Sequence, residues 1–350
     1  MLERVRAYLP EMLSHGAEFD AGARFPDADM AALREAGVLA APVPERLGGL
    51  GAGTEPGGAM LALTLLRLLG RGNLSVARLF EAQLNALRLV VRFGSAEQVA
   101  AAAADALAGH RFGLWVTDDP AAPLRWEGGA LVGRKGPSSG AGHCSRALVT
   151  VATADGIRMA IVALTGAERV VAVAGLQGMR AAANGTVTLD GARVLFWLGA
   201  AGDYLREPDF SCGAWRGSAA AAGGLEALVE AVAEGLRRKG QAEAPMQLAR
   251  FGAMVIARDT AVMWAERAAM LAEAETADEG ARLAMVNLAR TAVEAACLDA
   301  IRDAQRSLGL GAFIAPSPVE RLVRDLGTYL RQPAPDAVLL EAAAWHLARA

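Results

Sequence analysis

The sequence has few of the residues that build metal sites and disulfide frameworks. Its 350 residues include three cysteines, Cys144, Cys212 and Cys297, and four scattered histidines. The cysteines are odd in number, widely spaced and form no CxxC pair, so neither a disulfide framework nor a zinc site is indicated. We expect them to be small buried apolar residues, and we expect no metal cofactor.

The sequence also lacks long apolar runs and blocks of charge of one sign. Arg, Glu or Asp interrupts every Ala-rich stretch before it reaches the roughly 18 apolar residues of a membrane span. The N-terminal segment is amphipathic, carries acids and lacks the pattern of a signal peptide. The net charge of -3 leaves no basic surface for nucleic acid. We therefore expect a globular cytoplasmic protein with no membrane span and no nucleic-acid partner.

The spacing of apolar residues divides the chain into three parts. Residues 1–108 have helical spacing, residues 109–205 have short β-rich runs, and residues 206–350 return to long helical stripes rich in alanine. Such stripes let helices approach closely. The sequence therefore predicts an α+β protein with an N-terminal helical domain, a middle antiparallel β-barrel domain and a C-terminal four-helix bundle.

Three turn signals lie in the middle part, at Gly128-Gly129, Asp155-Gly156 and Asp190-Gly191. Each lies between short runs of residues that favour strands, and dipeptides of this kind favour hairpins. We therefore expect antiparallel strands that close into a small barrel or sandwich.

Several short motifs in a fixed order resemble those of the acyl-CoA dehydrogenase family of flavoproteins. They are VPERLGGLG, RFGSAEQ, FGLWVTDDP, KGPSSGAG, LQGMRAAANGTVTLDGARV, PMQLARF, AQRSLGLGAF and PVERLVRDL. The resemblance covers nearly the whole chain. It implies the fold of that family and a non-covalent FAD between the β domain and the C-terminal bundle. It also implies a homodimer or homotetramer in which a neighbouring subunit completes the site.

Matched residue by residue, the resemblance implies which side chains contact FAD. The positions are Trp115, Val116, Thr117, Ser139, Arg237, Gln247, Gln305 and Gly309. A strand that ends in a hydroxyl and free amides suits the polar edge of a flavin, and a guanidinium suits a diphosphate. The two hydroxyls also fit ordinary strand-end and turn polarity, and Arg237 also fits a solvated helix end. Pro137 stands where the family has an aromatic residue against the ring.

The chemistry of the family, α,β-dehydrogenation of an acyl thioester, needs a carboxylate near the α-carbon of the substrate. The usual Glu falls here at or beside Pro333, which cannot accept a proton. Asp336 is the nearest carboxylate and is the candidate base, although an acid also favours the first turn of a helix that starts at Pro335. Glu81 is a weaker candidate, because a single Glu on an Ala/Leu helix usually faces solvent. Asp209 is an outside candidate, because a second branch of the family carries its base on an earlier helix, where no acid of this sequence matches convincingly.

Three hypotheses for the function remain open. The preferred one is an FAD-dependent acyl-CoA dehydrogenase-like oxidoreductase that acts on an unidentified acyl thioester and passes electrons to an electron-transfer flavoprotein. The second is a two-component flavin-dependent monooxygenase of the same fold, with His143 near the flavin edge, although His143 also fits an ordinary loop. The third is a catalytically inactive family member that binds little or no flavin.

Overall fold

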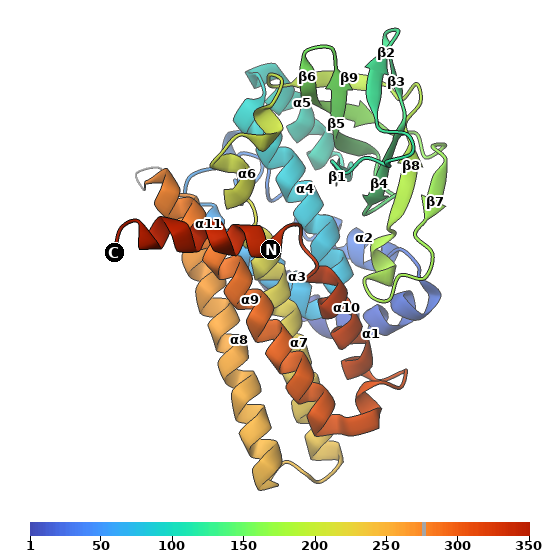
Figure 1. Cartoon of the computed structure of the whole chain (residues 1–350). Helices are drawn as coiled ribbons and strands as arrows, with labels where there is room; N and C mark the ends of the chain where they lie inside the picture. The colour runs from blue at the N-terminus through green and yellow to red at the C-terminus, as the bar shows by residue number, and fades with distance from the viewer. Residues whose placement is uncertain (275–277) are drawn as a thin grey trace.

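The computed structural model describes residues 1–274 and 278–350, which form a helical part, a β part and a second helical part (Figure 1). The first part contains α1 (Leu2–Gly22), α2 (Asp27–Glu35), α3 (Ala59–Gly72), α4 (Leu74–Phe93) and α5 (Ala96–Leu107). The α+β class and the order of the parts predicted from the sequence are confirmed.

Helix α4 is the central element of the first part. It begins at Asn73, whose side chain accepts a hydrogen bond from the backbone N–H of Ser75 at 3.0 Å, and it ends before Gly94. It packs on α3, on the C-terminal helix α7 and on strand β1, so most of its residues are buried. Three polar residues of α4, Ser75, Glu81 and Gln83, consequently lie inside the protein.

Nine strands form two sheets in the described part of the chain. They are β1 (Phe112–Trp115), β2 (Arg125–Glu127), β3 (Ala130–Val132), β4 (Arg134–Ser138), β5 (Arg146–Thr153), β6 (Gly156–Ala163), β7 (Val170–Ala172), β8 (Gly185–Thr188) and β9 (Val194–Leu198). One sheet has the order β3-β2-β5-β6-β9 with β1 beside β5, and the other has the order β4-β8-β7. The pair β1–β5 is parallel, so the larger sheet is mixed rather than purely antiparallel.

Two of the three predicted hairpins form, at Gly128-Gly129 and at Asp155-Gly156. The hairpin predicted at Asp190-Gly191 is wrong, because this turn carries the chain from β8 in one sheet to β9 in the other. The turn is fixed on the neighbouring strand instead. Asp190 accepts a hydrogen bond from the N–H of Gly133 at 2.7 Å, and Gly191 donates to the carbonyl of Leu131 at 2.9 Å.

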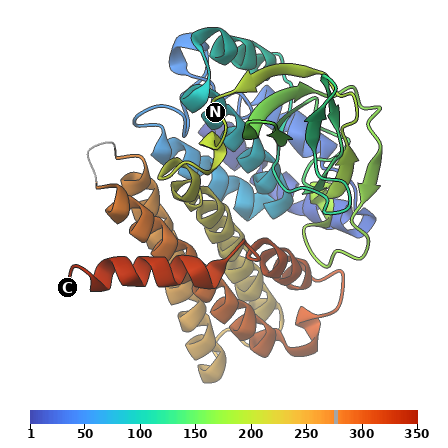
Figure 2. The same ribbon diagram turned by 45° about the horizontal axis from the view of Figure 1, so that its top comes forward.

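The last part contains α6 (Asp209–Cys212), α7 (Trp215–Arg238), α8 (Pro245–Ala272), α9 (Glu279–Leu308), α10 (Pro318–Tyr329) and α11 (Pro335–Leu347). The three long helices α7, α8 and α9 run side by side, and α11 lies across them on α9 (Figures 1 and 2). Helix α9 ends at Gly309, as its sequence predicts. Within the described residues, none of the helices has an apolar stretch that could cross a membrane.

Glycines let α3 and α7 touch backbone to backbone. A Cβ atom on Gly223 of α7 would lie 2.0 Å from the carbonyl oxygen of Arg67, and one on Gly70 of α3 would lie 2.2 Å from the carbonyl oxygen of Ala220. Real Cβ atoms do not approach so closely, so each position accepts only hydrogen. This contact sets the distance between the first helical part and the bundle.

Helix α10 connects the bundle to both other parts through two adjacent side chains. Arg324 donates to Asp20 of α1 and to the carbonyl of Gln177 in the β part, both at 2.7 Å. Asp325 accepts from the N–H of Met179 in the β part at 2.7 Å. The arginine and aspartate of the VERLVRDL segment therefore have a structural role.

Candidate functional site

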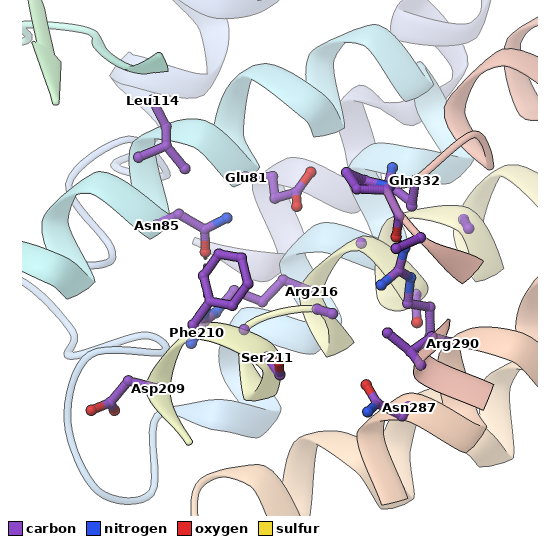
Figure 3. A pocket seen from close by; sticks show the side chains of 18 of the residues that line it. Glu81, Asn85, Leu114, Asp209, Phe210, Ser211, Arg216, Asn287, Arg290 and Gln332 are labelled. Carbon is purple, nitrogen blue, oxygen red and sulfur yellow. Dashed lines mark hydrogen bonds between the residues drawn. The ribbon is translucent and has the colours of Figure 1, made fainter. Parts of the chain in front are cut away.

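A cavity of about 360 Å³ lies where the three parts meet (Figure 3). Its wall comes from α4, α6, α7, α9, the loop between α10 and α11, and Leu114 of β1. Small-molecule sites in proteins have volumes of roughly 300–1,000 Å³. The cavity therefore has the size of a site for a small substrate, and both helical parts and the β part contribute to it.

Glu81 of α4 lines the cavity and is only 8% exposed. Its Oε2 accepts from the hydroxyl of Tyr329 at 2.8 Å and from Arg78 at 3.0 Å. No described residue donates to Oε1, which leaves that oxygen for a ligand. Burial raises the pKa of Tyr329 well above its ordinary value, and Glu81 adds to this effect. The sequence-based expectation that Glu81 faces solvent is wrong.

A second polar group lies on α7, where Arg216 lines the cavity and is 3% exposed. It donates to Asn85 at 3.0 Å and to Glu273 at 3.1 Å. Burial, with Arg88 nearby, lowers the pKa of Arg216 to about 10. Burial would raise the pKa of Glu273, but Arg216 and Arg88 outweigh it and hold that pKa below its ordinary value.

The opposite wall is formed by α9 and the α10–α11 loop. Asn287 and Arg290 line it, and Arg290 donates to the carbonyl of Pro333. Gln332 donates to the carbonyl of Tyr329 at 2.7 Å. The loop therefore contributes an amide and a carbonyl to the cavity wall, and no carboxylate.

Three carboxylates line the cavity, and each is paired with arginine. Glu81 pairs with Arg78, Asp209 with Arg92 at 3.0 Å, and Glu294 with Arg331. Asp209, an outside candidate from the sequence, is thus at the cavity, but both of its oxygens face arginines. Glu81 combines burial with one oxygen that no described residue occupies.

Asp336, the base favoured by the sequence, does not line the cavity. It is exposed in the first turn of α11, which starts at Pro335. Pro333 and Ala334 line the cavity immediately before it. Its position is the one expected for an acid that stabilises a helix N-terminus.

The strand end expected to meet a flavin lies beside the cavity. Leu114 lines the cavity, whereas the next residue, Trp115, points into the β core and donates from Nε1 to the carbonyl of Ser139 at 2.9 Å. Thr117 is exposed, and no described residue hydrogen-bonds its hydroxyl or its N–H. Alternation along the strand therefore directs the side chain of Trp115 away from the cavity.

A buried lysine fixes this strand end. Lys135 is one of two lysines in the chain and has 0% exposure. Its Nζ contacts Asp118 at 2.7 Å, Thr150 at 2.9 Å and the carbonyl of Val116 at 3.2 Å. Burial lowers the pKa of Lys135, while Asp118 opposes that shift. Lys135 is not among the site residues that the motifs imply, and its only signal in the sequence is the lysine of KGPSSGAG.

The strand end fits the polar edge of a flavin ring, the group that the motifs imply. Thr117 offers an unbonded hydroxyl and N–H. Ser139 donates to Asn184 at 2.9 Å, and its oxygen can still accept a hydrogen bond. Pro137 is exposed at this surface, so no aromatic side chain stands at that position.

The other four predicted contacts gather at the opposite end of the bundle. Gln247 donates to the carbonyl of Ser307 at 3.2 Å, beside Gln305 and Gly309. Arg237 is exposed near Glu234, at the end of α7. Gln305 lies 15 residues along α9 from Arg290, which is about 22 Å. These residues cannot meet a small group at the cavity of their own chain.

His143 is also away from the cavity. Its ring stacks on Phe25 with centroids 4.0 Å apart, and burial lowers its pKa.

Of the cysteines, Cys212 and Cys297 are buried and Cys144 is half-buried. In the described ranges, no group of three His, Cys, Asp or Glu side chains is placed to hold a metal ion.

Comparison with known proteins identifies the class of this fold. Residues 1–110 match the family model for the N-terminal domain of acyl-CoA dehydrogenase. Butyryl-CoA dehydrogenase from Megasphaera elsdenii has the same fold, with 16% identity over 99% of this chain and 97% of that chain and a TM-score of 0.84. No curated protein matches the sequence. The chain therefore has the fold of the acyl-CoA dehydrogenases, and its first 110 residues match the N-terminal domain of that family.

Two flavin-containing structures share this fold. KijD3, solved with FMN and a dTDP-linked amino sugar, has 22% identity over 99% of this chain and 92% of that chain, with a TM-score of 0.82. FMN-bound TdsC from Paenibacillus sp. A11-2 has 17% identity over 100% of this chain and 97% of that chain, with a TM-score of 0.82. At these identities the likeness establishes the fold alone.

Proposed function

We propose that the chain is a flavin-dependent oxidoreductase that dehydrogenates an acyl thioester held in the cavity. The main support is the strand β1, whose Leu114 lines the cavity while Thr117, at its end, offers unbonded donors. A ring bound at that end would adjoin a substrate in the cavity. A bound flavin supplies the hydride acceptor for such a reaction. FAD is the cofactor implied by the motifs, and FMN is the flavin in two structures of this fold.

In this proposal Glu81 replaces Asp336 as the base. Its Oε1 accepts the proton that leaves the α-carbon, while the hydride leaves from the β-carbon. Tyr329 and Arg78 both bind Oε2, so they hold the carboxylate in one orientation with Oε1 unoccupied. Leu89 and Phe210, which also line the cavity, give it an apolar surface that excludes water from the reacting atoms.

The test is anaerobic mixing of the flavin-loaded protein with a panel of acyl-CoA thioesters. We expect loss of the flavin absorbance with at least one of them, and reoxidation by an electron-transfer flavoprotein. A flavin that stays oxidised with every thioester would overturn dehydrogenation. Colourless protein that FAD and FMN both fail to reconstitute would favour the inactive family member.

One observation favours monooxygenation as a second candidate. Among the described residues, every carboxylate that lines the cavity is held in an ion pair with an arginine. Oxygenation needs no α-proton abstraction. Oxygen consumption that depends on reduced FMN and on substrate, with no anaerobic reduction by thioesters, would decide for this candidate.

Replacement of Lys135 with Met tests the flavin site directly. The change removes a donor from the carbonyl of Val116, so we expect the affinity for FMN to fall about tenfold. The unfolding free energy should change by only about 1 kcal/mol, because Met fills the buried space and Asp118 is partly exposed. Titration of flavin fluorescence and urea unfolding measure the two effects.

Arg71→Met is the control. Arg71 of α3 pairs with Glu230 at 2.9 Å, outside the strand end and outside the cluster of Arg237, Gln247 and Gln305. It should leave FMN affinity unchanged. Equal affinities in the wild type and in both variants would show that the strand end does not hold the flavin.

A further inference from the structure

Arg290 is a partly buried cation in the cavity wall. It donates to the carbonyl of Pro333, and among the residues that the structure describes no carboxylate lies within ion-pair distance of it. Glu294, one turn further along α9, is bound by Arg331 instead. Burial lowers the pKa of Arg290. The remaining guanidinium donors therefore lack an anionic partner.

Asn287 lies one turn before Arg290 on the same face of α9. It lines the cavity and is 3% exposed, and its Oδ1 has no hydrogen-bond partner in the described part of the chain. Buried polar atoms are nearly always paired in folded proteins. The cavity wall beside Arg290 therefore contains a second polar atom without a partner, Oδ1 of Asn287. This oxygen can accept a hydrogen bond from a ligand (Figure 3).

We propose that Arg290 and Asn287 bind a polar acyl group that carries a carboxylate and, next to it, a hydroxyl or amide donor. The inference rests on the proposed function, because it names the class of acyl group that the cavity takes. The carboxylate pairs with the guanidinium of Arg290, whose planar fork matches two oxygens. The donor pairs with Oδ1 of Asn287. A plain alkyl chain at this wall would leave both groups unpaired.

The test compares thioesters of matched length by calorimetry on the purified full chain. Glutaryl-CoA and valeryl-CoA each have a five-carbon acyl group and differ in a terminal carboxylate, and 4-hydroxyglutaryl-CoA adds a hydroxyl on the carbon next to that carboxylate. We expect glutaryl-CoA to bind at least about tenfold more tightly than valeryl-CoA, with a further gain for the hydroxylated compound.

Two variants assign these preferences to residues. Arg290→Gln should remove the preference for the carboxylate and leave the affinity for valeryl-CoA unchanged, and Asn287→Leu should remove the gain from the hydroxyl. Arg302→Gln, on an exposed arginine of the same helix that pairs with Asp299 at 3.0 Å, should behave as the wild type. Equal binding of the two five-carbon thioesters, or a preference that survives Arg290→Gln, would overturn the inference.

Free glutarate separates this inference from the proposed function. If no thioester binds but glutarate raises the melting temperature of the wild type and not of Arg290→Gln, the subsite stands and the thioester proposal fails. If glutarate has no effect and no thioester binds, the subsite fails too. If Arg290→Gln does not fold, Arg290→Lys replaces it in the test. Lysine keeps the positive charge but lacks the two parallel donors of the guanidinium, so this variant should bind glutarate more weakly than the wild type.

Discussion

Replacement of Glu81 with Gln is expected to slow reduction of the flavin by an acyl thioester at least about 100-fold. The amide has the shape of the carboxylate and can still accept from Tyr329 and Arg78, but it cannot take a proton from the substrate. Binding of the thioester should change only a few-fold. Stopped-flow absorbance measures the reduction, and calorimetry measures the binding.

Two variants accompany this experiment. Tyr329→Phe removes one hydrogen bond to Glu81 and keeps the carboxylate, so it should slow reduction far less. Asp336→Asn should have no effect, because Asp336 is exposed and outside the cavity wall. Normal reduction by Glu81→Gln would remove Glu81 from the mechanism, and loss of activity in Asp336→Asn would restore Asp336 as the base.

Replacement of Gly223 with Ala is expected to lower the free energy of unfolding by about 1–3 kcal/mol. The new methyl group would meet the carbonyl oxygen of Arg67 at 2.0 Å, so α3 and α7 must move apart. Urea unfolding followed by circular dichroism measures the change.

Gly252→Ala gives the matched comparison for this effect. Gly252 lies inside α8, and a Cβ atom there meets nothing within 4 Å. Alanine favours the helix by up to about 1 kcal/mol, so this variant should be slightly more stable than the wild type. Destabilisation of similar size in both variants would show that the α3–α7 contact is not the cause.

Local signals in the sequence predicted most of the fold. Gly94 ends α4 and Gly309 ends α9, because each stop depends on residues close in the chain. The change from helical to strand spacing near residue 109 also follows from local pattern. The turn at Asp190-Gly191 was misassigned, since its role depends on hydrogen bonds to Leu131 and Gly133, nearly 60 residues earlier.

The candidate site was harder to predict for the same reason. Glu81 is buried because Tyr329, 248 residues away, donates to it and because α7 covers α4. Asp336 is close in the chain to Pro333, the position of the usual catalytic Glu. However, α11 starts at Pro335 and places Asp336 on the surface. Motif matching fixes a position along the chain, whereas the direction of a side chain depends on where the next helix begins.

The connection through α10 has a consequence for how the molecule melts. Because Arg324 and Asp325 hold α1 and the β part to the bundle, loss of either contact leaves a charged side chain of α10 without one of its partners. Separate heat-absorption peaks for individual parts are therefore not expected. A scanning calorimeter should record a single cooperative transition, and a fragment cut before α6 should fail to accumulate as folded protein.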